Sequence, residues 1–230
     1  ATIEVIQGNV THLCSLDLRK QKSIDLSANV ERDGTLDLHC EVYKVIMEEY
    51  NGGNYLPVRL STFCEVEAGS GLGSSSTLVV CMVKSFVEVL SLSLDSFEIA
   101  HLAYKVERIN CGFQGGKQDQ YSAAFGGFNF MEFYASDKTL INPLRLKESV
   151  VSELEASLIL GYTGTSRVSS RIIKDQSENL EKKSEEALNA MHEMKRQAHE
   201  MKEFLLQSDI SGFVNSMREG WLNKKRSSSS

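Results

Sequence analysis

Apolar and polar residues alternate with a period of two in short segments of the first third of the chain. Between residues 58 and 66 one face carries Val58, Leu60, Thr62, Cys64 and Val66. The opposite face is mostly charged or hydroxyl-bearing, and this alternation predicts a half-buried strand. Three earlier strand-like runs are expected over residues 2–6, 12–17 and 22–27.

Helical spacing of apolar residues dominates the middle of the chain. Helices are expected over residues 38–50, 77–90, 95–110 and 118–124, and strands over 128–134 and 157–162. Asp95 followed by Glu98 has the pattern of a capping box, which predicts that a helix begins there. Pro143 and the polar stretch after it indicate a boundary, so we predict one domain over residues 1–150 and a second over 151–230.

The composition changes beyond residue 168. Residues 169–206 contain neither Gly nor Pro, and the apolar residues from Ala187 to Leu205 follow a 4-3-4-3-4 spacing. This spacing predicts a long helix whose apolar stripe packs within its own domain, and an intermolecular coiled coil is the alternative. A final helix is expected over residues 210–225.

Charge and cysteine usage exclude several classes of protein. The 230 residues include 25 Lys and Arg against 31 Asp and Glu, a formal net charge of −6. This balance argues against a nucleic-acid binder, although backbone amides can still hold a small anion. No apolar run is long enough to span a bilayer. The five cysteines include no C-x-x-C pair, which indicates reduced thiols in a cytoplasmic protein.

The strongest chemical feature is a Gly/Ser-rich segment between a predicted strand and a predicted helix. It consists of Gly69, Ser70, Gly71, Leu72, Gly73, Ser74, Ser75 and Ser76, called the Gly/Ser loop below. Alternate glycines allow close approach of an anion, and a helix start adds its positive dipole end. The loop suits nucleotide phosphates, but its spacing fits neither a Walker A loop nor a dinucleotide fingerprint. A tight turn without a ligand is the alternative.

A second segment places two carboxylates on either side of a glycine-rich turn. Glu107 lies on a predicted helix, and Asp119 follows Gly115, Gly116 and Lys117. On residue types alone, one carboxylate could hold Mg²⁺ and the other could take a hydroxyl proton. The alternative is an exposed helix residue and a helix cap.

These two segments together resemble the GHMP small-molecule kinases. Residues 71–75 are similar to that family's G-L-G-S-S run, and residues 116–120 to its G-x-x-D-[NQ] site. The resemblance implies ATP as substrate, Asp119 as catalytic base, and Ser75 and Glu107 as Mg²⁺ ligands. It also implies a two-domain α+β fold, with a mixed sheet and helices in each half. The family's first and last motifs would precede Ala1 and follow Ser230, so we expect a chain truncated at both ends.

A third segment points to one branch of that family. Residues 161–170 read G-Y-T-G-T-S-R-V-S-S and resemble a pattern of the D-glycero-D-manno-heptose 7-phosphate kinases. The resemblance implies a sugar-phosphate site made of Gly115, Gly116, Lys117, Thr163, Gly164 and Arg167. A surface ion pair is the alternative role for Arg167.

The expected reaction is phosphorylation of the anomeric hydroxyl of the heptose phosphate, which gives a 1,7-bisphosphate. A fucokinase-like or galactokinase-like sugar kinase is one alternative, and a non-catalytic relative that binds nucleotide or sugar is another. The expected partners are therefore ATP and a sugar phosphate, with no nucleic acid and no membrane. The sequence leaves the oligomeric state open, a homodimer included.

Overall fold

The computed structural model describes residues 1–67, 69–161, 178 and 185–227. The described chain separates into two compact units, one of residues 1–126 and one that begins at residue 127. Helices and strands occur in both units, which confirms the predicted α+β class. Within the described ranges, no helix has the length and apolar character needed to cross a membrane.

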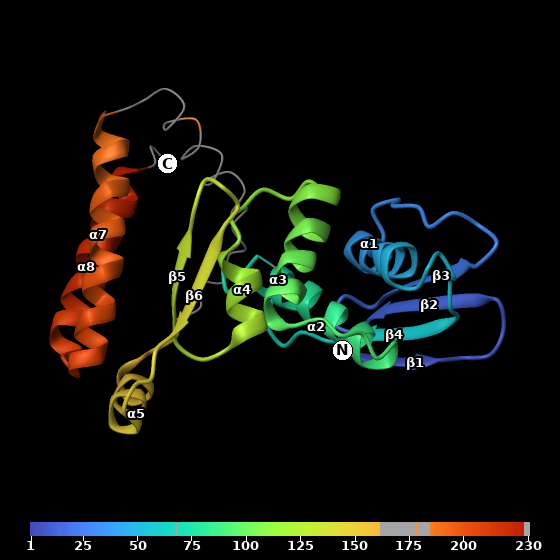
Figure 1. Cartoon of the computed structure of the whole chain (residues 1–230), viewed down its shortest axis with the longest axis horizontal. Helices are drawn as coiled ribbons and strands as arrows, with labels where there is room; N and C mark the ends of the chain where they lie inside the picture. Colours follow the sequence, from blue (N-terminus) through green and yellow to red (C-terminus); the bar gives the residue numbers. More distant parts are fainter. Residues whose placement is uncertain (68, 162–177, 179–184, 228–230) are drawn as a thin grey trace. The chain divides into compact units, whose positions relative to one another are not determined.

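A four-stranded mixed sheet forms one layer of the first unit (Figure 1). Its strands, in the spatial order β1-β4-β2-β3, are β1 (Thr2–Val5), β4 (Val58–Thr62), β2 (Val10–Ser15) and β3 (Lys20–Asp25). Strand β4 pairs antiparallel with β1 and parallel with β2, and β2 pairs antiparallel with β3. All four strands were predicted, but β4 ends earlier than expected because the chain leaves the sheet at Phe63, which is exposed.

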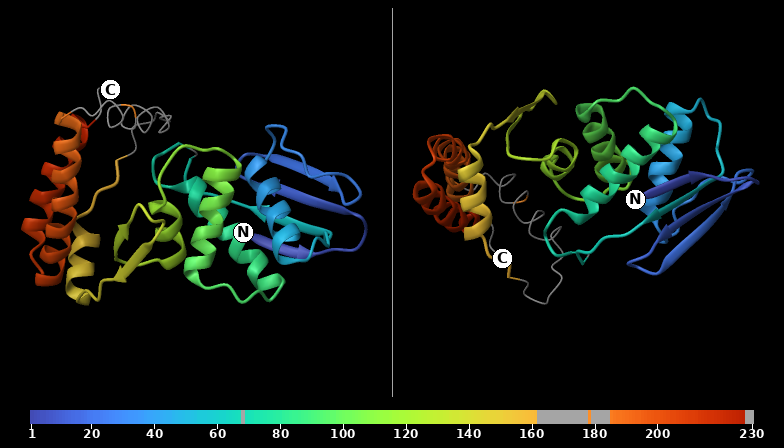
Figure 2. Two further views of the ribbon diagram at one scale, coloured as in Figure 1. Left: turned by 45° about the horizontal axis from the view of Figure 1, so that its top comes forward. Right: turned by 90° about the horizontal axis from the view of Figure 1, so that it is seen from below.

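Helices make up the rest of this unit, and some of them cover one face of the sheet (Figure 2). They are α1 (Asp37–Val45) with a π-helical turn at Ile46–Tyr50, α2 (Ser74–Val89), α3 (Ser96–Tyr104) with a π-helical turn at Lys105–Asn110, and α4 (Gln118–Phe125). The predicted capping box is confirmed, because the Glu98 amide donates to Asp95 Oδ1 at 2.9 Å and the Asp95 amide donates to Glu98 Oε2 at 2.8 Å. Helix α2 begins three residues earlier than predicted, inside the Gly/Ser loop.

The core of the first unit lies between the sheet and the helices. Leu13 and Leu60, from neighbouring strands, are fully buried together with Phe86 of α2. Two polar side chains that reach this core are hydrogen-bonded: Thr11 Oγ1 donates to the Tyr43 hydroxyl at 2.9 Å, which donates to the Leu56 carbonyl at 2.8 Å. Burial of the alternating apolar face therefore fixes which side of the sheet the helices cover.

The second unit combines a β-hairpin with helices. Its elements are β5 (Asn129–Phe133), β6 (Thr139–Pro143), α5 (Glu148–Ser157), α7 (Glu185–Gln207) and α8 (Ile210–Arg226). Strands β5 and β6 pair antiparallel. The Phe130 ring lies 4.9 Å from the His199 ring, and Lys202 Nζ lies 4.8 Å from the Phe130 ring centre, so the hairpin contacts α7.

One expectation for the second unit was wrong, and another lies partly outside the described residues. The strand predicted over 157–162 is absent from the described part of that range, because Ser157 ends α5 and residues 158–161 are irregular. A strand needs a neighbour for its N–H and C=O groups, and no described strand pairs there. The polar stretch after Pro143 contains α5, and the division into domains over residues 1–150 and 151–230 stays a prediction. Most of residues 169–184, the start of the predicted long helix, lie outside the described ranges.

Candidate active site

The Gly/Ser loop joins the region after β4 to the first turn of α2. Gly69, Gly71 and Gly73 have φ angles of 82°, 81° and 72°, a left-handed conformation that side chains with a Cβ rarely adopt. Gly73 is the N-cap of α2 and has no side chain to occupy the helix's first N–H groups. Alternate left-handed residues before an uncapped helix start form an anion-binding nest.

The residues of the Gly/Ser loop differ in how available their amide and hydroxyl groups are to a phosphate. The Ser70 amide already donates to the Glu67 carbonyl at 3.2 Å, and Leu72 is exposed. The Ser70 hydroxyl oxygen is buried and has no hydrogen-bond partner among the described residues. The amides of the first turn of α2 are therefore the stronger candidates for holding phosphate.

Glu107 lies on the π-helical turn after α3 and is 1% exposed. Its Oε1 accepts a hydrogen bond from Ser75 Oγ at 2.8 Å, and its Oε2 accepts from Ser76 Oγ at 2.7 Å. Gln120 Nε2 donates to the same Oε2 at 2.6 Å, and Arg108 Nη1 lies 3.5 Å from Oε1. Both carboxylate oxygens thus have partners, which offsets the desolvation cost of a buried charge. Ser75, Ser76, Glu107, Arg108 and Gln120 are called the Glu107 cluster below.

The geometry of Ser75 and Glu107 fits two adjacent ligands of one Mg²⁺ ion. Octahedral Mg²⁺ with oxygen ligands at about 2.1 Å holds neighbouring ligands about 3 Å apart, and the 2.8 Å between Ser75 Oγ and Glu107 Oε1 is close to that spacing. The described residues contain no group of three or more His, Cys, Asp or Glu side chains suited to a metal. A site of one carboxylate and one hydroxyl matches Mg²⁺, which takes its other ligands from water and phosphate.

Asp119 lies in the first turn of α4 and is exposed. A Cβ built on Gly73 would lie 3.3 Å from Asp119 Cγ, so the carboxylate lies beside the start of α2. A side chain at position 73 would crowd this carboxylate as well as straining the backbone. The structure thereby brings the two sequence segments together at the Gly/Ser loop.

The six residues expected to bind the sugar phosphate are placed unevenly. Gly115 packs against the Arg108 guanidinium, Gly116 is exposed with open space around it, and Lys117 Nζ lies 5.0 Å from the centre of the Tyr104 ring. Thr163, Gly164 and Arg167 lie outside the described residues. The sugar-binding role of this set stays a prediction.

Sequence reasoning missed the buried polar partners of Glu107. Ser76 Oγ donates to Glu107 and accepts from Gln120 Nε2 at 3.1 Å and from Arg108 Nη2 at 3.3 Å. Ser76 was predicted to contact phosphate, and no role was predicted for Arg108 or Gln120. Gln120 and Arg108 directly follow the two carboxylates in sequence, but their contact with Ser76 spans 44 and 32 residues. No local pattern reports such a contact.

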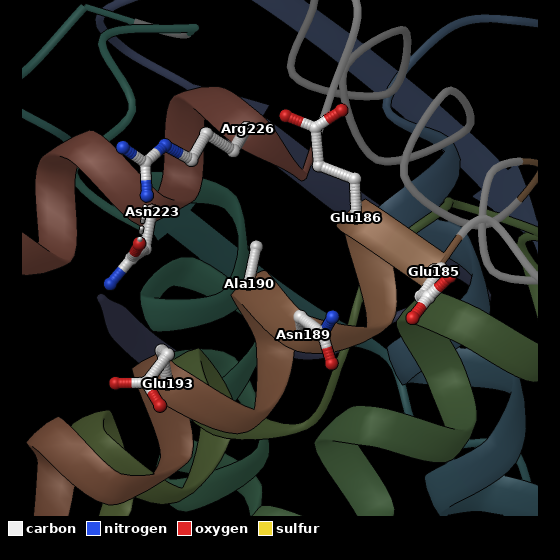
Figure 3. Close-up of a pocket in the computed structure, with 7 residues that line it drawn as sticks. All are labelled: Glu185, Glu186, Asn189, Ala190, Glu193, Asn223 and Arg226. Carbon is white, nitrogen blue, oxygen red and sulfur yellow. Dashed lines mark hydrogen bonds between the residues drawn. The ribbon is translucent and has the colours of Figure 1, made fainter.

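A separate cavity lies in the second unit, along α7 and α8 (Figure 3). Its volume is about 520 Å³, and its lining residues are Glu185, Glu186, Asn189, Ala190, Glu193, Asn223 and Arg226. Three carboxylates against one guanidinium disfavour a phosphate ligand on electrostatic grounds. None of the predicted site residues lines it, so it does not belong to the candidate active site.

Comparison with known proteins identifies the part of the chain that holds this site. Residues 37–127 match the family model described as the GHMP kinases N terminal domain. The matched range contains the whole Gly/Ser loop, the Glu107 cluster and Asp119.

Individual relatives extend the similarity beyond that domain. A D-glycero-alpha-D-manno-heptose 7-phosphate kinase from Campylobacter jejuni is 44% identical over 193 residues, which are 84% of this chain and 56% of the relative. A crystal structure of a D-glycero-D-manno-heptose 1-phosphate kinase from Bacteroides thetaiotaomicron matches with a TM-score of 0.82 and 38% identity, covering 98% of this chain and 66% of that chain.

More distant kinases share the fold. A galactokinase from Lactococcus lactis, complexed with galactose, matches with a TM-score of 0.66 at 16% identity, over 97% of this chain and 66% of that chain. The chain spans little more than half of the length of the Campylobacter jejuni relative.

Proposed function

Residues 37–127 of this chain are a GHMP kinase N-terminal domain, and from that premise we propose that the protein is an ATP-dependent sugar kinase acting on a heptose phosphate. The observation that carries the proposal is the contact between two carboxylate-bearing segments and one anion-binding loop. Ser75 and Glu107 lie 2.8 Å apart at the start of α2, and Asp119 lies beside Gly73. Phosphoryl transfer to a hydroxyl needs three parts at one place. They are a phosphate-binding loop, ligands for a Mg²⁺ ion, and a carboxylate that can accept a proton.

In the proposed mechanism, the first-turn amides of α2 and the glycine nest hold the ATP phosphates. Ser75 and Glu107 would hold Mg²⁺, which would neutralise charge that develops on the transferring phosphoryl group. Asp119 accepts the proton of the sugar hydroxyl as that oxygen attacks the γ-phosphorus in line and the bond to ADP breaks. Gly115, Gly116 and Lys117, with Thr163, Gly164 and Arg167, bind the sugar phosphate.

The heptose assignment rests on the named relatives. The Campylobacter jejuni protein is named a heptose 7-phosphate kinase and the Bacteroides thetaiotaomicron protein a heptose 1-phosphate kinase. The two names share the sugar and differ in the phosphate position. We propose that the anomeric hydroxyl of D-glycero-D-manno-heptose 7-phosphate is the acceptor, so that the product is the 1,7-bisphosphate. A cytoplasmic location is part of the proposal, and the five free cysteines support it.

A fucokinase-like activity is the second candidate. It is favoured by a match to the bifunctional fucokinase/GDP-fucose pyrophosphorylase of Arabidopsis thaliana, 24% identical over 179 residues, which are 77% of this chain and 17% of that protein. Both candidates phosphorylate a sugar, so the acceptor distinguishes them. Nucleotide binding without phosphoryl transfer would instead indicate a non-catalytic relative.

The test is a coupled measurement of ADP release by the full-length protein with Mg²⁺ and ATP. The acceptors are D-glycero-D-manno-heptose 7-phosphate, L-fucose and D-galactose, and ³¹P NMR of the product identifies the oxygen that is phosphorylated. We expect release with the heptose phosphate and a new signal from an anomeric phosphate. Release with fucose or galactose alone would overturn the heptose assignment, and a signal at another carbon would overturn the proposed position.

A further inference from the structure

Arg108 has a central place in the Glu107 cluster that the proposed reaction does not use. We propose that Arg108 is a positioning residue, which fixes the segment that carries Asp119 relative to the Ser75–Glu107 pair. The inference rests on the proposed function, because it assigns Arg108 to the geometry of that same site.

The Arg108 guanidinium contacts two other segments of the chain and its neighbour Glu107. Its Nη1 donates to the Gln114 carbonyl at 2.9 Å, and its Nη2 donates to Ser76 Oγ at 3.3 Å at the start of α2. Nη1 also lies 3.5 Å from Glu107 Oε1, and the side chain is only 13% exposed. The planar guanidinium can serve several acceptors in fixed directions, which an ammonium group cannot do.

The segment from Gln114 to Gln120 is held at both ends by this cluster. Arg108 holds the Gln114 carbonyl at one end, and Gln120 donates to Glu107 Oε2 and to Ser76 Oγ at the other. Asp119 lies between these two attachments. A shift of the segment would therefore move Asp119, the proposed base, relative to Ser75 and Glu107, the proposed Mg²⁺ ligands.

Gly115 leaves the space that the Arg108 guanidinium occupies. A Cβ at Gly115 would lie 2.7 Å from Arg108 Cζ and 2.9 Å from Nη2, closer than real Cβ contacts. The guanidinium therefore packs directly on the backbone of the segment that it holds. Arg108 Nε is buried without a partner among the described residues, so the contacts of Nη1 and Nη2 set the orientation of the group.

The test uses Arg108→Lys, which keeps the charge and removes the fork, and Gly115→Ala, which displaces the guanidinium without changing it. Gly112→Ala is the matched control, because Gly112 also has a positive φ of 73° but a Cβ there would meet nothing within 4 Å. Two measurements are made on each variant of the full-length protein. Calorimetric binding of ADP with Mg²⁺ and with EDTA gives the metal preference, and the Mg²⁺ dependence of ADP release with heptose 7-phosphate separates kcat from the half-saturating metal concentration.

We expect both variants to lower the ratio of ADP affinity with Mg²⁺ to ADP affinity without it by about tenfold, the usual effect of removing a partner of a metal ligand. The half-saturating Mg²⁺ concentration should rise and kcat should fall. A double variant that combines the two substitutions should have a metal preference within about twofold of that of the more strongly affected single variant. Gly112→Ala should leave the metal preference within about twofold of wild type.

Two results would overturn the inference. One is an unchanged metal preference in Arg108→Lys and Gly115→Ala, with only the active fraction reduced. The other is an equal effect of Gly112→Ala, which would assign the loss to backbone strain. The ADP measurement does not depend on the sugar, so a failure of the heptose assignment alone would leave this test intact.

Discussion

The two carboxylates of the candidate site have opposite surroundings. Glu107 is 1% exposed and accepts hydrogen bonds from Ser75, Ser76 and Gln120. Asp119 is exposed at the first turn of α4, beside Gly73. A buried carboxylate with every oxygen occupied holds a fixed position and contributes to the fold, whereas an exposed one is available to a substrate.

This difference separates effects on catalysis from effects on stability. Changing Asp119 should affect turnover alone, and changing Glu107 should affect both turnover and stability. Two other polar residues of the first unit extend the comparison outside the site: His39 is buried and Asp95 is exposed. The four residues are thus buried or exposed, and inside or outside the candidate site. Each of the following variants examines one of these four combinations.

The largest expected effect is that of Asp119→Asn. Removing the proposed base should lower kcat by about 10²- to 10⁴-fold, while the melting temperature stays near the wild-type value because the side chain is exposed. Steady-state ADP release and thermal melting measure the two quantities. Near wild-type turnover would show that Asp119 is not the base.

Glu107→Gln should affect both quantities. An amide offers one acceptor where the carboxylate offers two, and its NH₂ group would face the donor groups of Ser75 or Ser76 and Gln120. We expect a 10- to 100-fold loss of activity and a loss of stability of about 1–3 kcal/mol, measured by denaturant unfolding. Glu88→Gln, an exposed position on α2, is the control. Unchanged stability would contradict the role of the buried cluster.

His39 is buried outside the candidate site, and its Nε2 lies 2.8 Å from Thr62 Oγ1. Burial lowers the pKa of His39 from 6.5 to about 4. The neutral imidazole therefore stabilises the folded state fully above about pH 6.5, and this contribution is lost as the pH falls toward 4. We expect the free energy of unfolding to fall by on the order of 3 kcal/mol over that range. The pH dependence of the melting temperature measures this loss.

The matched control for that pH dependence is His39→Gln, which keeps an N–H donor for Thr62 and cannot titrate. Its melting temperature should fall less steeply between pH 6.5 and 4. An identical slope in both proteins would rule out His39 as the source.

The smallest expected effect is that of Asp95→Ala. This substitution removes the acceptor of the Glu98 amide at the start of α3 and should cost about 1 kcal/mol of stability, with kcat unchanged. Asp95→Asn keeps an acceptor and should lose less. A measurable loss of kcat in Asp95→Ala would indicate that α3 influences the site through its N-terminus.

Prediction from the sequence was most accurate where local physics dominates. The strands of the first sheet, the capping box at Asp95 and the helix over residues 210–225 all follow from side-chain period and backbone capping. It missed β6 and α5, and it placed a strand over residues 157–162, where the apolar residues 158–160 are exposed in the structure. A short apolar run looks alike whether or not a partner strand exists.

The sequence by itself determined the chemistry that this protein can offer: alternate glycines before a helix start, hydroxyl groups, and two carboxylates twelve residues apart. The tertiary structure alone decided which of these groups meet. Ser76 is hydrogen-bonded to Arg108 and Gln120, which lie 32 and 44 residues away in sequence. Gly115 leaves room for the Arg108 guanidinium as well as allowing the chain to turn. The physical reason is that period and capping act within a few residues, whereas the partners of a buried charge are set by the packing of distant segments.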